Sequence, residues 1–65
     1  MAERKSDGAD GEVLIEFVVQ GNVVKVTAID PKSGTEASIV GPASAPRPVL
    51  ESNALKKLIY EALEN

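Results

Sequence analysis

The chain has 65 residues, seven of them basic and ten acidic, which gives a formal net charge of −3 and a sequence pI near 4.7. This length suits one small domain and leaves no room for a catalytic apparatus spread over several elements. Histidine, cysteine and tryptophan are absent, which excludes imidazole bases, thiol nucleophiles, disulfides and indole stacking platforms. The acidic charge also disfavours a domain that must neutralise phosphates.

The first eleven residues are rich in charge and have no apolar stretch. Such a segment buries too little apolar surface to offset the entropy lost on ordering. We therefore predict a disordered tail over residues 1 to 11 and a single domain over residues 12 to 65. The tail does not have the pattern of a secretory signal, and no apolar run approaches the roughly 20 residues of a membrane span. These features favour a soluble cytoplasmic protein.

Three runs rich in β-branched residues predict strands, at residues 12–20, 23–29 and 36–40. Gly21-Asn22 suits a two-residue type II′ hairpin loop, in which the glycine takes a positive φ. In the second turn, Asp30 to Thr35, Gly34 can take the left-handed conformation that returns the chain. The result is an antiparallel meander.

The loop lengths also predict the register of the strands. A two-residue loop places Phe17 opposite Val26, and a four-residue second loop places Val26 opposite Ile39. Because side chains alternate between the two faces of a sheet, one face then carries no charged residue and becomes the predicted core face. Its members are Val13, Ile15, Phe17, Val19, Val24, Val26, Ala28, Ala37 and Ile39.

The proline-rich stretch from Gly41 to Pro48 is predicted to end the sheet and to carry the chain over it. An amphipathic helix follows, and it begins either with Pro48 in its first turn or with Ser52 as N-cap. Its apolar stripe comprises Ala54, Leu55, Leu58, Ile59, Ala62 and Leu63. One helix on the apolar face of the meander gives an α+β domain of two layers, β-β-β-α.

Short motifs along residues 12 to 63 are Glu12-Val13-Leu14, Gly21-Asn22, Lys25-Val26, Ala28-Ile29-Asp30-Pro31, Gly34-Thr35-Glu36 and the run from Ser38 to Ala45. Together they resemble a family of short alphaproteobacterial proteins classified only as a domain of unknown function. The run from Ala28 to Ala45 is the most specific part. The resemblance implies a bacterial cytoplasmic origin and assigns no site residues.

The polar side chains form no recognisable catalytic or metal-binding motif. The serines have no histidine to activate them, and Lys56 and Lys57 lie on the polar side of the predicted helix among glutamates. The second turn loosely resembles a phosphate-binding loop, but it joins two strands instead of opening a helix. We therefore predict no enzymatic activity, no catalytic, cofactor or metal residues, and no small-molecule substrate.

The second face of the predicted sheet is the strongest functional candidate. Its large aliphatics form a patch interrupted by Glu16, Lys25 and Thr27. Valine and isoleucine are also common in strands because of their high β-propensity, which offers an explanation of the patch without a partner. The candidate interaction face comprises Leu14, Val18, Val23, Lys25, Ile29 and Val40.

Two partner classes suit a sheet face of this kind. The first is protein, either a second copy of the chain or a larger heterologous partner. The alternative is RNA or single-stranded DNA bound on the sheet. This alternative is disfavoured, because sheet readers stack bases on aromatic rings and the only aromatic residues are Phe17, on the core face, and Tyr60, on the helix.

Overall fold

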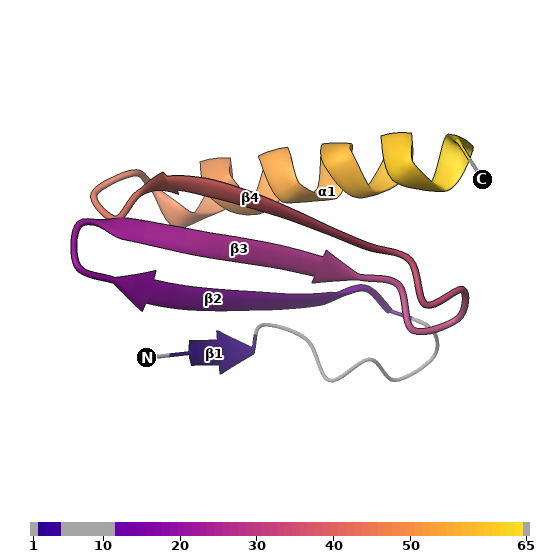
Figure 1. Ribbon diagram of the computed structural model, residues 1–65, viewed down its shortest axis with the longest axis horizontal. Coiled ribbons are helices and arrows are strands. Elements are labelled where there is room, and N and C mark those ends of the chain that lie inside the picture. The colour runs from indigo at the N-terminus through magenta and orange to yellow at the C-terminus, as the bar shows by residue number, and fades with distance from the viewer. Residues whose placement is uncertain (1, 5–11, 65) are drawn as a thin grey trace.

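A computed structural model describes residues 2–4 and 12–64 and shows one helix lying on one face of a sheet (Figure 1). The elements are β1 (Ala2–Arg4), β2 (Leu14–Gln20), β3 (Val23–Ile29), β4 (Glu36–Pro42) and α1 (Arg47–Leu63). All strand pairs are antiparallel, in the order β1-β2-β3-β4. The predicted β-β-β-α architecture is confirmed by β2, β3, β4 and α1, and β1 is a short additional strand.

Both predicted registers are confirmed. Phe17 pairs with Val26 across β2 and β3, and Val26 pairs with Ile39 across β3 and β4. The glycines of the two turns have the expected positive φ, 61° at Gly21 and 76° at Gly34. Turn chemistry and strand alternation therefore agree on which side chains face the helix.

The second turn is organised by Asp30. Its carboxylate accepts hydrogen bonds from the Lys32 N–H and the Ser33 hydroxyl, each at 3.0 Å, and its carbonyl accepts one from the Gly34 N–H at 2.8 Å. An aspartate that holds the backbone two residues further on is typical of a structural turn. These contacts agree with a turn rather than a phosphate loop.

Strand β1 was not predicted, because Ala2–Arg4 belong to the segment expected to be a disordered tail. They pair with β2, with Glu3 opposite Phe17. An edge strand offers unpaired N–H and C=O groups, and backbone pairing satisfies them whatever the side chains are. The rest of the predicted tail, residues 1 and 5–11, lies outside the described residues, as does residue 65.

Strand β4 extends to Pro42, two residues beyond the predicted end. Proline is tolerated in an edge strand when its nitrogen faces away from the neighbouring strand. Here the next residue, Ala43, donates its N–H to Asn22 O at 2.8 Å, so the alternation of the ladder points the Pro42 nitrogen outward. Gly41 lies directly under the helix: a Cβ placed there would be 2.7 Å from Leu50 Cδ2.

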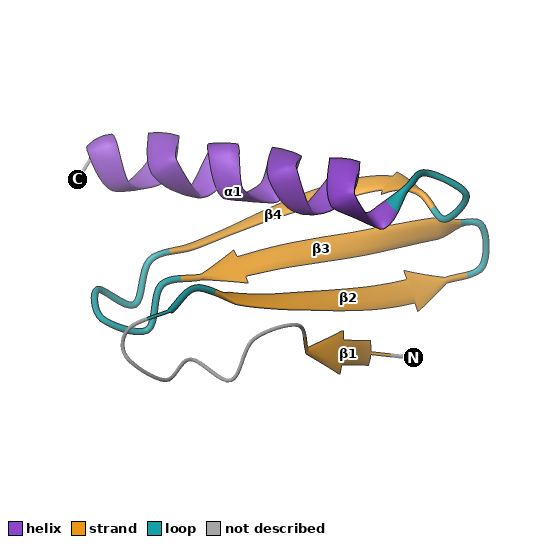
Figure 2. Ribbon diagram, turned by 180° about the vertical axis from the view of Figure 1, so that it is seen from behind, coloured by secondary structure: helices purple, strands orange, loops and turns teal. Residues whose placement is uncertain are grey.

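Helix α1 begins with Pro48 in its first turn, one of the two predicted starts, so Ser52 is inside the helix. Pro46 is the N-cap residue, and it makes no side-chain capping hydrogen bond. The helix packs mainly on β4 and β3, as the view from behind also shows (Figure 2). It therefore lies toward one side of the sheet instead of over its middle.

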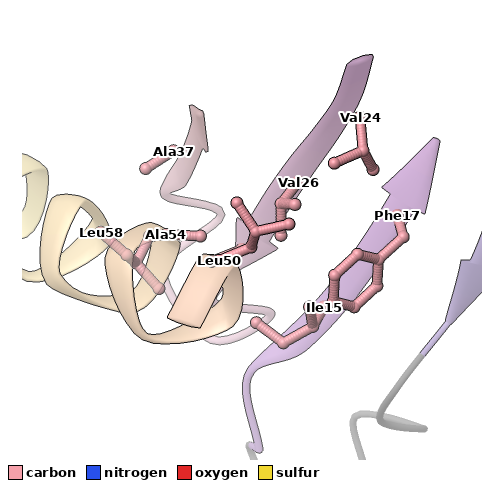
Figure 3. Packing of buried hydrophobic residues seen from close by; sticks show 9 residues of the cluster. Ile15, Phe17, Val24, Val26, Ala37, Leu50, Ala54 and Leu58 are labelled. Carbon is pink, nitrogen blue, oxygen red and sulfur yellow. The ribbon is translucent and has the colours of Figure 1, made fainter. Parts of the chain in front are cut away.

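The core forms where α1 meets the sheet (Figure 3). Its buried members are Ile15, Phe17, Val24, Val26, Ala28, Ala37, Leu50, Ala54 and Leu58. Phe17 and Val26 are the largest fully buried side chains, and the Arg47 guanidinium carbon lies 5.0 Å from the centroid of the Phe17 ring. Val13 and Ile39 of the predicted core face pack against this cluster while partly exposed, whereas Val19 is 37% exposed at the end of β2.

The predicted helical stripe is only half buried. Ala54 and Leu58 are in the core and Leu55 packs against it, but Ile59 is 59% exposed and Leu63 77% exposed, and Ala62 is exposed as well. The last turns of α1 extend past the end of β3 (Figure 1), so none of the described strands lies beneath them. The predicted burial of these three residues is therefore wrong, and the first turn instead supplies Leu50.

Candidate interaction face

The six residues of the candidate interaction face lie on β2, β3 and β4, on the face of the sheet opposite to the helix. The strand register arranges them in rows that run across the strands. Val18, Lys25 and Val40 form one row, and Leu14 and Ile29 belong to another. The remaining residue is at the hairpin end of the sheet, where Val23 stands between Gln20 and Pro42.

Exposure differs among these six residues. Val40 is 67% exposed and Val23 is 45% exposed, and Lys25 is exposed between them. Leu14, Val18 and Ile29 are half-buried. The structure therefore brings together the predicted residues on one face, but the exposed apolar area is concentrated at its β3–β4 side.

A polar row crosses the middle of this face. Glu16, Thr27 and Ser38 are register partners on successive strands. The Thr27 and Ser38 hydroxyl oxygens lie 2.9 Å apart and share a hydrogen bond. This row separates the pair Leu14 and Ile29 from the valines, so the predicted patch consists of two smaller apolar groups.

The charges of the face lie close to its apolar groups. Glu16 is diagonal to Lys25 across β2 and β3, and Glu36 pairs with Ile29 at the far end of β4. Polar and charged groups around a small apolar centre are typical of protein interfaces that exist both free and bound. This arrangement can bind a partner by shape and charge.

The helix carries a second exposed apolar group that the sequence analysis did not identify. Its members are Val49, Ile59, Tyr60 and Leu63, each more than half exposed. The sequence did contain a signal for these exposed residues, because the apolar stripe is too wide for one face. Ile59 and Leu63 are rotated far around the helix axis from Ala54. A helix that packs mainly on two strands does not bury so wide a stripe.

Two sets of side chains bear on metal or catalytic chemistry in the part of the chain that the structure describes: the acidic residues and the helix lysines. Within residues 12–64 there is no group of three or more acidic residues placed to hold a metal ion. Lys57, one of the two lysines predicted on the polar side of the helix, donates a hydrogen bond from Nζ to Ser38 O at 2.7 Å. The Lys57 side chain therefore makes a structural contact with the edge of β4.

Comparison with known protein families gives a match over most of the chain. The family model described as "Domain of unknown function (DUF6898)" matches residues 10–64. No curated protein and no solved structure matches significantly. Among the described residues, no helix is both long and apolar enough to cross a membrane.

Proposed function

This chain belongs to the DUF6898 family, a domain of unknown function, so we propose a function from the chain's own surface: a non-enzymatic protein-interaction module that binds through the candidate interaction face. The observation that carries the proposal is the exposure of Val40 and Val23, 67% and 45%, on the face that the helix leaves uncovered. Neighbouring exposed aliphatics rimmed by polar residues are typical of protein-binding surfaces.

The partner is a second copy of this chain or a larger protein. A domain of this size buries only about 60% of the surface that its unfolded chain exposes, so further burial on association stabilises it markedly. A two-fold dimer would place the same face of each copy in contact. The proposal includes a cytoplasmic location, which cell fractionation tests.

The experiment compares two valine-to-lysine variants. In Val23→Lys the new side chain stands on the candidate interaction face, where its ammonium reaches water in the monomer. A partner on this face would bury that charge without a counter-charge, and we expect association to weaken at least about tenfold. Val49→Lys is the matched control, because Val49 is similarly exposed, at 52%, but lies on the helix.

Sedimentation over a concentration series measures self-association of the parent and both variants. Affinity capture with the three proteins as baits measures binding to a heterologous partner. We expect the parent and Val49→Lys to behave alike and Val23→Lys to lose the partner while remaining folded. A monomeric parent at millimolar concentration, together with equal capture by all three baits, would contradict the proposal.

Nucleic acid, the alternative partner, gains no support from the geometry. Phe17 is 1% exposed beneath the helix, and Tyr60 is on the surface of α1. The described part of the outer sheet face therefore presents no aromatic ring on which a base could stack.

A further inference from the structure

Strand β4 is an edge strand: in the described part of the chain, no strand pairs with its outer side. At one end of the β3–β4 pair, the Asp30 N–H bonds to Thr35 O, and at the other the Ala43 N–H bonds to Asn22 O, both at 2.8 Å. Bonded and non-bonded pairs alternate along an antiparallel ladder, so these two bonds fix which groups of β4 face outward. The outward N–H groups belong to Glu36, Ser38 and Val40.

An edge with a row of outward N–H and C=O groups is a template for pairing with another strand. Two features of this chain oppose such pairing on β4. The Lys57 ammonium donates to Ser38 O at 2.7 Å, from a position 19 residues further along the chain. At the end of the strand, Pro42 has no N–H to offer, and its nitrogen faces outward.

The contact from Lys57 lies near the middle of the edge, because Ser38 is the third of the seven residues of β4. A strand that pairs with β4 must take over the Ser38 carbonyl, which means displacing and partly desolvating the ammonium. If the incoming strand is β4 of a second copy, a two-fold axis near this position also brings the two ammonium groups together. Like charges placed directly across a strand pair are destabilising.

We propose that Lys57 closes the β4 edge against pairing with a second copy of this chain. The lysine belongs to the helix and acts on the sheet, so the side chain links the packing of α1 to the accessibility of β4. This role is independent of the candidate interaction face, because pairing at the edge uses outward backbone groups instead of the side chains of the sheet.

The test replaces the ammonium by an apolar group of similar length, in Lys57→Met. We expect self-association at least about tenfold tighter than that of the parent protein. Sedimentation over a concentration series measures it. Amide hydrogen exchange at Ser38 and Val40 shows whether the association occurs at the β4 edge. Pairing at the edge slows exchange of these outward N–H groups as protein concentration increases.

Lys56→Met is the matched control. Lys56 is the adjacent exposed lysine of the same helix, so its replacement adds the same apolar group and removes the same charge away from Ser38. We expect it to associate as the parent does. Equal association of the parent and both variants would overturn the proposal, and so would tighter association of Lys57→Met without slower exchange at Ser38 and Val40.

A rescue variant distinguishes strand pairing from non-specific hydrophobic association. Glu36→Pro removes an outward N–H without removing a bond to β3, and Glu36 is not one of the six residues of the candidate interaction face. The double variant Lys57→Met, Glu36→Pro should therefore return to the association of the parent. Circular dichroism confirms that it is folded. A folded double variant that still associates as Lys57→Met does would contradict pairing at the edge. Association through the candidate interaction face leaves exchange at the outward amides unchanged, so the two proposals fail separately.

Discussion

The two faces of the sheet are made from the same strands and similar residues, yet one is a core and the other a surface. On the helix-covered face, Phe17 and Val26 are at most 1% exposed, whereas on the outer face Val40 is 67% exposed. The difference is not strand propensity, because both faces are rich in valine and isoleucine. It lies in the row of Glu16, Thr27 and Ser38, which crosses the outer face and has no counterpart under the helix.

The largest loss of stability is expected when the side chain at the centre of the helix-covered face is truncated. Phe17→Ala deletes the largest buried side chain, and such a truncation costs about 3 to 5 kcal/mol. A domain this small has a total stability of about that size, so we expect the variant to be unfolded. Circular dichroism and amide spectra measure the outcome.

The outer face supplies the control for that substitution. Val40→Ala also truncates an aliphatic residue of the sheet, but at an exposed position, and its effect on the free energy of unfolding should stay within about 0.5 kcal/mol. A cooperatively folded Phe17→Ala protein, or a large loss of stability in Val40→Ala, would mean that the two faces have been assigned the wrong way round.

A smaller effect is expected where the helix touches the sheet most closely. Gly41→Ala adds a Cβ at 2.7 Å from Leu50 Cδ2, and Leu50 is itself buried. Overpacking costs about 1 to 3 kcal/mol, and the reduced entropy of the unfolded chain returns about 0.4 to 1 kcal/mol. We expect a net loss of about 1 kcal/mol in chemical denaturation.

A double-mutant cycle tests the cause of that loss. Leu50→Val removes the Cδ2 atom, so Gly41→Ala should be less destabilising in the Leu50→Val background than in the parent. The same loss in both backgrounds would show that the close approach of Leu50 is not responsible.

These comparisons also show what could be predicted from the sequence. The register followed from two loop lengths, because a one-residue slip between the first two strands would have moved Lys25 onto the face of Phe17. The membership of the candidate interaction face followed from the same alternation. Local rules of this kind succeed where a turn of known length joins two strands with a clear pattern.

The position of the helix on the sheet could not be predicted in this way. The apolar stripe of α1 shows which side of the helix faces the sheet, but it does not show which strands lie beneath the helix. The exposure of Ile59 and Leu63 and the burial of Leu50 were therefore not predicted. The lateral position depends on tertiary packing, including the close contact at Gly41. Likewise, β1 pairs through backbone groups that composition does not reveal.

The smallest expected change in stability comes from the polar row of the outer face. The double variant Thr27→Val, Ser38→Ala removes both partners of the hydroxyl pair and leaves Ser38 O available to Lys57. Replacing both members of a hydrogen bond by apolar groups of similar shape is nearly neutral, so we expect a change within about 0.5 kcal/mol. Ser38→Ala alone should cost about 1 kcal/mol, because it leaves the half-buried Thr27 hydroxyl without this partner.

The consequence of the double variant should appear in association instead of stability. Without the two hydroxyls, the apolar group of Leu14 and Ile29 becomes continuous with the valines across β3 and β4. If the polar row is what keeps the outer face a surface, sedimentation should show stronger self-association of the double variant than of the parent at equal concentration. Unchanged association would mean that Glu16 and Lys25 suffice to keep this face exposed, and that the hydroxyl pair serves only to satisfy its own hydrogen bond.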